Sequence, residues 1–182
     1  MHMPNIPSII YISGAPGAGK TTLAKILSEQ LYVPHISSDL VRGGVALTNP
    51  KHNRRETLNN VFVPIMINLA KKKVSFIADH VLQQGVSEGD IINRIKPYAN
   101  IIYIHVETAN PLERYKNRIE TSTLPSVVDR RDHLLGLIKP HSENLSKTAN
   151  QLNLDVPTIT VNTDDGYTPD VDAIVAFVRQ NL

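Results

Sequence analysis

The chain contains no cysteine. Disulfide bonds, cysteine-based zinc sites and a thiol nucleophile are therefore excluded, and the composition is compatible with a reducing compartment. The chain also has no apolar run of membrane-spanning length. Residues 1–8 lack the positive segment followed by a long apolar stretch that marks a secretory signal peptide. We therefore expect a cytoplasmic protein.

The chain also has no marked excess of positive or negative charge. The 19 basic and 17 acidic residues give a formal net charge of +2, which is too balanced for a surface that is positive all over and binds nucleic acid. Any basic site must therefore be local. A length of 182 residues with 41% hydrophobic content suffices for one sizeable core, so we expect a single domain over residues 1–182.

Short apolar runs alternate along the chain with longer stretches of helical spacing. This alternation is typical of strand–helix units that stack into a parallel sheet. The expected strands are Ile9–Ser13, Pro34–Ser37, Val74–Asp79, Asn100–Val106 and Thr158–Asn162. The sequence thus predicts an α/β fold with a five-stranded parallel sheet flanked by helices.

Prolines mark several expected helix boundaries. The Asn-Pro-Leu-Glu run at residues 110–113 and the Thr-Pro-Asp run at residues 168–170 each place a capping residue before a proline at the first helical position. Pro64 is expected to kink a helix, and Pro140 to divide residues 132–152 into two helices. The apolar face of the kinked helix is expected to contain Leu58, Phe62, Ile65 and Leu69.

The most specific motif is Gly-Ala-Pro-Gly-Ala-Gly-Lys-Thr at residues 14–21, which matches G-x-x-x-x-G-K-[ST] between an apolar strand and a leucine-spaced helix. Glycines let the backbone amides turn toward phosphates, and the following helix presents its positive end to them. In such a loop Lys20 reaches the β and γ phosphates and the Thr21 hydroxyl ligates magnesium. We therefore predict a P-loop NTPase fold that binds ATP and Mg²⁺. The predicted phosphate-binding residues are Gly14, Ala15, Pro16, Gly17, Ala18, Gly19, Lys20, Thr21 and Thr22.

A carboxylate stands at the end of the third expected strand, where apolar residues lead into Asp79. Ligands bind at this edge of a parallel α/β sheet. We therefore predict that Asp79 and Thr21 hold magnesium; the alternative is that Asp79 caps the next turn. His80 follows, but an isolated histidine is more often structural, and the seven histidines lack metal-ligand spacing.

Asp39 and Arg42 follow the second expected strand, three residues apart and near the same sheet edge. Such an Asp can accept the proton of an attacking hydroxyl, and such an Arg can fix an anionic acceptor or the transferring phosphoryl group. The alternative, on the spacing alone equally good, is that Ser38 or Asp39 caps a short helix and Arg42 pairs with it on the surface.

Arg114 and Arg118 lie four residues apart on the helix opened by Asn110, hence on one face. That helix runs into residues 120–132, whose threonines, serine and proline break the helical pattern, so we expect a small mobile lid there. An arginine delivered by a closing lid stabilises charge on the transferring phosphoryl group and helps to exclude water. We rank Arg118 ahead of Arg114 for this role; the alternative is a solvated basic face.

Taken together, these residues resemble the small P-loop kinases grouped with polynucleotide 5′-hydroxyl kinases, chloramphenicol phosphotransferases and zeta-toxin-like kinases, over nearly the whole chain. The resemblance implies that Asp39 is the general base, that Arg42 lies at the active site and that Arg118 contacts the phosphates. It also implies that Asn162 and Thr163 line the adenine. The residues after Arg42 match the acceptor-binding pattern of no one subgroup.

Two questions about function stay open at this point. The acceptor of an ATP-dependent kinase is either a small-molecule hydroxyl, which we favour slightly, or a nucleic-acid 5′-hydroxyl. A basic groove for the latter would be built from Lys51, His52, Arg54, Arg55, Lys71, Lys72 and Lys73. The rival from another class is a switch that binds or hydrolyses ATP without an acceptor; a base such as Asp39 argues against it.

Overall fold

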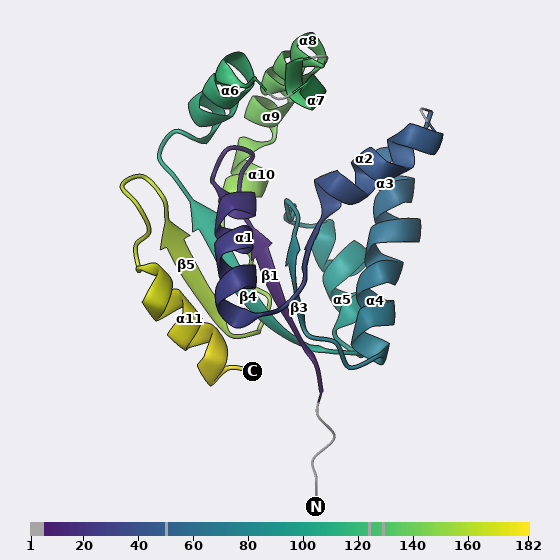
Figure 1. Ribbon diagram of the computed structural model, residues 1–182, viewed down its shortest axis with the longest axis vertical. Helices are drawn as coiled ribbons and strands as arrows, with labels where there is room; N and C mark the ends of the chain where they lie inside the picture. The colour runs from purple at the N-terminus through teal and green to yellow at the C-terminus, as the bar shows by residue number, and fades with distance from the viewer. Residues whose placement is uncertain (1–5, 50, 124, 129) are drawn as a thin grey trace, which may run out of the picture.

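The computed structural model describes residues 6–49, 51–123, 125–128 and 130–182. Leu124 and Asp129, which belong to the expected lid, lie outside the described residues. Within these ranges all strands pair in parallel, in the order β2-β3-β1-β4-β5 (Figure 1). The strands are β1 Ser8–Ser13, β2 His35–Ser37, β3 Phe76–Asp79, β4 Asn100–Glu107 and β5 Thr158–Asn162. The predicted five-stranded α/β fold is thus confirmed.

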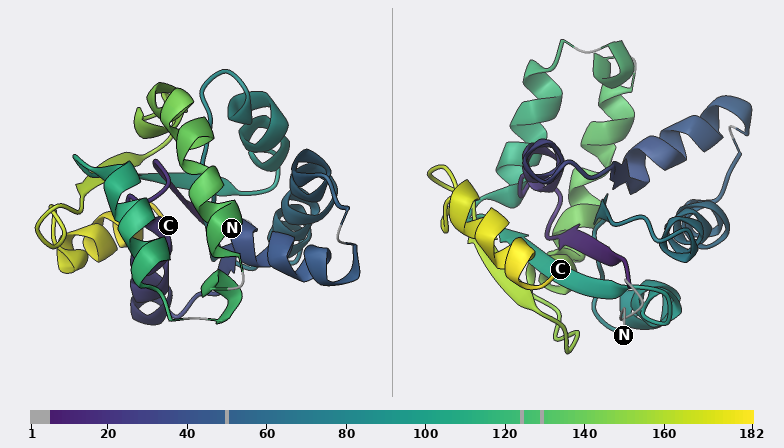
Figure 2. Two further views of the ribbon diagram at one scale, coloured as in Figure 1. Left: turned by 90° about the horizontal axis from the view of Figure 1, so that it is seen from above. Right: turned by 60° about the horizontal axis from the view of Figure 1, so that its bottom comes forward.

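The central strand β1 shows why the sheet is sandwiched between helices. Its isoleucines and tyrosine are fully buried on both faces, as expected for a strand of a parallel sheet that is covered on both sides. Ile10 and Ile12 pack with α1 (Lys20–Leu31) and α11 (Val171–Gln180) on one face. Ile9 and Tyr11 pack on the other face with the helices between β2 and β4 (Figures 1 and 2).

The remaining helices surround the carboxyl edge and the second face. Helices α2 and α3 stand on one side of that edge and α6 to α9 on the other (Figure 2, left). Their bounds are α2 Ser38–Thr48, α3 Arg54–Thr57, α4 Val63–Lys71, α5 Asn93–Ile95, α6 Pro111–Thr121, α7 Pro125–Val128, α8 Arg131–Gly136, α9 Ile138–Glu143 and α10 Leu145–Ala149. Two π-helical turns, η1 Leu58–Phe62 and η2 Glu88–Ile92, precede α4 and α5. In the described ranges no helix is long and apolar enough to cross a bilayer.

The interruption expected at Pro64 takes the form of the π turn η1. Pro64 lies in the first turn of α4, and the wider turn before it accommodates a residue that has no N–H and whose ring crowds the preceding turn. The π turn also rotates the helix that follows, so Ile65 and Leu69 are only half-buried, contrary to expectation. The buried face is formed by Phe62, Val63, Met66 and Ala70.

Other predicted helix details need correction. Helix α6 begins at Pro111 as predicted, but the side chain of Asn110 makes no capping bond. Helix α11 begins two residues later than predicted, because Thr168 exchanges backbone hydrogen bonds with Asn162 and so stays extended; Asp170 caps the helix instead. Pro140 does not divide residues 132–152 into two helices as predicted: α8, α9 and α10 occupy this region, with breaks at Leu137 and Asn144. Pro140 lies within the first turn of α9, where its missing N–H breaks no helical bond.

Candidate active site

The phosphate loop is wedged between β4 and the start of α6. Gly14 and Gly17 have φ of 147° and 90°, and a Cβ on either would lie 1.9 Å from a backbone oxygen, that of Val106 or Pro111. Both positions therefore require glycine on two grounds, backbone conformation and space. These close contacts hold the loop against β4 and the start of α6.

Replacing Gly17 with alanine is expected to destabilise the fold by about 2–4 kcal/mol and to prevent ATP binding, because the loop must move away from Pro111. Gly85→Ala is the matched control: Gly85 also has a positive φ, of 76°, but nothing lies within 4 Å of the position that an alanine methyl group would take there. Urea denaturation measures both variants. Equal losses of stability would contradict the account of a loop held by contact.

Lys20 opens α1 directly behind this loop. Its Nζ donates a hydrogen bond to the backbone oxygen of Ala15 at 2.7 Å, across the loop. Burial lowers the pKa of Lys20 to about 8, against the opposing effect of the carboxylates of Asp79 and Asp39. At neutral pH the lysine is therefore a cation within the loop, available to phosphate oxygens.

Asp79 is buried at the end of β3, with its Oδ2 3.0 Å from His35 Nε2 on the neighbouring strand β2. Burial by itself would raise the pKa of Asp79, but hydrogen bonds from His35, Ser37 and Thr21 outweigh it and hold the pKa below its usual value. The structure thus brings the two predicted magnesium ligands together. A buried, ionised carboxylate beside a hydroxyl fits Mg²⁺, which takes few protein oxygens besides phosphate and water.

Asp39 and Arg42 lie on the first turns of α2 and form an ion pair of 3.0 Å. The side chain of Asp39 is 75% exposed and that of Arg42 is 27% exposed. Such a pair is what the surface alternative describes, yet both residues also line a cavity of about 600 Å³. Pro16 of the phosphate loop lines the same cavity, so Asp39 and the loop face one space.

The cavity is enclosed by segments distant in the sequence. One wall comes from α2, α3 and η1, and the opposite wall from α9 and its neighbours, consistent with the arrangement in Figure 2. His80 lies between them and its Nδ1 is 2.9 Å from the Ser38 hydroxyl, which ties the end of β3 to the start of α2. Burial lowers the pKa of His80 to about 4, so it is neutral at pH 7. Polar residues on the walls include Ser38, Asp39, Arg42, Asn53, Arg54, Arg55, His80, Asp90 and His141.

Arg114 braces the loop after β5 instead of extending alongside Arg118. Its guanidinium donates to the Thr163 hydroxyl at 2.8 Å and to the Thr108 hydroxyl at 3.1 Å. The buried Thr163 in turn donates to the backbone oxygen of Ala18 at 2.9 Å. Both residues therefore support the phosphate loop from behind. Of the residues predicted around the adenine, Asn162 lines a second cavity of about 290 Å³ beside Ala15.

The structure does not place every predicted residue at the phosphate loop. The Arg118 guanidinium lies 5.4 Å from the centre of the Tyr115 ring, and within the described ranges it makes no hydrogen bond or ion pair with the loop. Thr22 is exposed on α1. His35 and the bracing role of Thr163 were missed; only the pairing of β2 with β3 brings His35 to Asp79, and no local pattern signals it.

Comparison with known proteins places the chain in a family. A family model described as an AAA domain matches residues 10–134, which include the phosphate loop, both predicted magnesium ligands and most of the cavity. The chain belongs to this AAA-domain family.

Individual relatives match either over a short part of the chain or at low sequence identity. Adenylate kinase from Chlamydia trachomatis serovar L2 is 49% identical over 49 residues, which are 26% of this chain and 20% of the relative. The chain thus spans about a fifth of that protein. A crystal structure from Chloroflexus aurantiacus, of a protein provisionally named a kinase, has a TM-score of 0.74 and 23% identity and covers 97% of this chain and 99% of the other. APS kinase from Mycobacterium tuberculosis has a TM-score of 0.61, 13% identity and coverage of 97% and 99%. At these identities the structural likeness shows the P-loop NTPase fold alone.

Proposed function

We propose that this AAA-domain protein is an ATP- and magnesium-dependent kinase that transfers the γ-phosphate to a hydroxyl group of a small molecule. One observation carries the proposal: Pro16 of the phosphate loop and Asp39 line the same cavity of about 600 Å³. A volume of this size suits a small-molecule substrate. A switch that only hydrolyses ATP needs no carboxylate beside an acceptor-sized cavity.

Each residue of the site has a chemical role in this proposal. Asp39 accepts the proton of the acceptor hydroxyl as its oxygen bonds to the γ phosphorus. The bond from that phosphorus to the β–γ bridging oxygen breaks, ADP leaves, and Lys20 stabilises the negative charge on the phosphate oxygens. Arg42, already paired with Asp39 at 3.0 Å, orients that carboxylate and stabilises charge on the transferring group. Thr21 and Asp79 would hold Mg²⁺, and a bound Mg²⁺ would neutralise charge on the phosphate oxygens.

The lid and the domain boundaries belong to the proposal too. We propose that the whole chain acts as one kinase domain and that residues 120–132 close over the site. Arg118 lies in the last turn of α6, close to the start of this segment. Its positive charge lowers the pKa of Lys20, which places the two cations within electrostatic reach of each other. Closure would bring the Arg118 guanidinium from the Tyr115 ring to the phosphates and exclude water.

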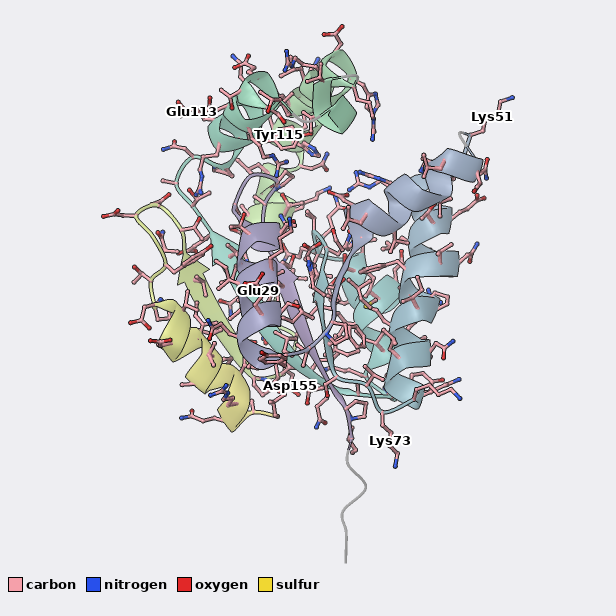
Figure 3. All side chains as sticks on the ribbon, viewed as in Figure 1. Glu29, Lys51, Lys73, Glu113, Tyr115 and Asp155 are labelled. Carbon is pink, nitrogen blue, oxygen red and sulfur yellow. The ribbon has the colours of Figure 1, made fainter. Side chains whose placement is uncertain are left out.

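A small-molecule acceptor is favoured over a polynucleotide by the distribution of basic residues. Lys51 and Lys73, at the two ends of the predicted basic cluster, lie at opposite ends of the molecule (Figure 3). Lys71 stacks on the Tyr98 ring, 4.9 Å from its centre. These charges therefore do not line one continuous groove, which a nucleic-acid backbone requires.

A second candidate acceptor is a phosphate group. The sequence match with adenylate kinase favours it, because adenylate carries a phosphate. An ionised phosphate oxygen has no proton to give up, so this reaction needs no general base. Asp39→Asn therefore separates the two candidates, since only transfer to a hydroxyl depends on the carboxylate.

ADP release from magnesium ATP tests the proposal in a panel of nucleosides, sugars, hydroxylated antibiotics, nucleotides and 5′-hydroxyl oligonucleotides. A kinase releases ADP rapidly only when its acceptor is present, because the closed site excludes water. ADP release at one rate with every compound and with none would instead support the switch.

The affinity for ATP is expected to fall as the pH rises above about 8. The pKa of Lys20 in the free protein is lowered to about 8, so the lysine is charged below this pH and loses its proton above it, whereas bound phosphates favour the charged form. Calorimetric titration from about pH 7 to about pH 9.5 measures the effect, with Lys20→Arg as control because arginine stays charged. Identical pH profiles of the two proteins would contradict the assignment.

A further inference from the structure

The wall of the cavity beside Asp39 carries an uncompensated positive charge. Arg42 is paired with Asp39, and Arg55 is paired with Asp90 at 3.0 Å; all four residues line the cavity. Arg54 lines it as well. In the part of the chain that the structure describes, Arg54 makes no ion pair or side-chain hydrogen bond. Of these three arginines, it is the one whose charge remains available.

The neighbouring groups do not neutralise this charge. His80 and His141 also line the cavity, and burial lowers the pKa of both, that of His80 to about 4. Burial and the nearby Arg42 lower the pKa of Arg54 itself, against the opposing effect of the Asp39 carboxylate, and the residue as a whole is exposed. An arginine nevertheless keeps its proton at physiological pH. This charge at the wall of the cavity therefore favours an anionic ligand.

The wall that holds Arg54 includes α3 and the two π-helical turns. Arg54 opens the short helix that leads into η1, whose Leu58 and Phe62 line the cavity, and Asp90 lies in η2. Arg94 of α5 joins the two turns, because it donates to Asn59 of η1 at 3.2 Å and to the backbone oxygen of Asp90 of η2 at 3.3 Å. The Arg55–Asp90 pair joins α3 to η2. π turns are often found at functional sites, and η1 places the apolar side chains of Leu58 and Phe62 in the same cavity wall as the arginine.

We propose that the phosphoryl acceptor is itself an anion, a small molecule whose carboxylate or phosphate group pairs with Arg54 while its less polar body packs against Leu58 and Phe62. The guanidinium donates paired hydrogen bonds to two oxygens of that group. The acceptor oxygen then lies toward Asp39 and the phosphate loop. This inference rests on the proposed function for the role of the cavity, but the anion site itself is a matter of binding.

Binding to matched pairs of compounds tests the inference. Each pair contains an anion and its uncharged parent: nucleoside 5′-monophosphates beside nucleosides, hexose 6-phosphates beside hexoses, and aldonates beside the sugars. Thermal shift and calorimetry are carried out on wild type, Arg54→Gln, Arg54→Lys and Lys51→Gln, with the phosphate loop saturated by a non-hydrolysable ATP analogue. Lys51→Gln removes the same charge from the same segment outside the cavity lining (Figure 3).

The expected result is that at least one anion binds more tightly than its parent, and that Arg54→Gln reduces this preference on the order of 10- to 100-fold. Arg54→Lys should retain part of it and Lys51→Gln all of it. Binding of no anion in the panel, or a preference unchanged by Arg54→Gln, would overturn the inference. Anion binding that depends on Arg54 without phosphoryl transfer would keep the anion site and reject the kinase, so the two failures are distinguishable.

Discussion

Lys20→Met is expected to reduce phosphoryl transfer by about 10³-fold or more, which corresponds to about 4 kcal/mol of transition-state stabilisation. Lys20 begins α1 behind the phosphate loop and holds its Nζ 2.7 Å from the Ala15 oxygen. The carboxylates of Asp79 and Asp39 favour the charged form of this lysine. Methionine keeps the length and removes the charge, so ATP binding should weaken and transfer should nearly vanish. Initial rates at saturating ATP measure the effect on transfer alone.

Lys25→Met provides the matched control for this variant. Lys25 lies on the same helix, five positions later, and is exposed. The same substitution there should change the rate by less than about twofold, since an isolated exposed charge contributes little. A Lys20→Met variant that retained a tenth of the wild-type rate would be incompatible with a loop lysine that stabilises the transferred phosphate.

Asp39→Asn is expected to slow transfer to a hydroxyl by about 10²- to 10⁴-fold while ATP binding stays nearly unchanged. The side chain of Asp39 is 75% exposed and has Arg42 as its ion-pair partner, so loss of the carboxylate should hardly affect the fold. Asp39 lines the same cavity as Pro16 of the phosphate loop. A reduced kcat with an unchanged ATP dissociation constant is the signature of a lost base.

The control for Asp39→Asn is Asp172→Asn. Both residues are exposed acids in the first turn of a helix, α2 and α11 respectively, so both variants lose the same favourable interaction with the helix N-terminus. Only Asp39 lines the cavity. Equal rates in the two variants would leave Asp39 as a surface ion-pair residue and would favour either the phosphate acceptor or the switch.

Much of the fold follows from local sequence. The strand positions were predictable to within two residues, because runs such as Ile9–Ser13 are buried on both faces and carry no polar interruption. The helix details failed where tertiary contacts intervene. Thr168 was expected to cap α11, but its backbone pairs with Asn162. The π turn before Pro64 shifted the buried face of α4.

The candidate site was predictable only in its contiguous parts. The loop at residues 14–21 and Asp79 at a strand end have local signatures, and the structure brings Thr21 to Asp79. Arg54 was predicted only as one member of a basic cluster, because only the cavity distinguishes it from its paired neighbour Arg55. Arg114 shares a helix face with Arg118 by its spacing, yet its side chain turns to Thr163.

The fate of the γ-phosphate tests the central claim most directly. With magnesium ATP labelled at the γ position and the acceptor identified by ADP release, the label should appear on the acceptor in amounts equal to the ADP formed, with almost none as inorganic phosphate. That result would establish that the protein is a kinase. Label recovered entirely as inorganic phosphate, whatever compound is added, would contradict the account.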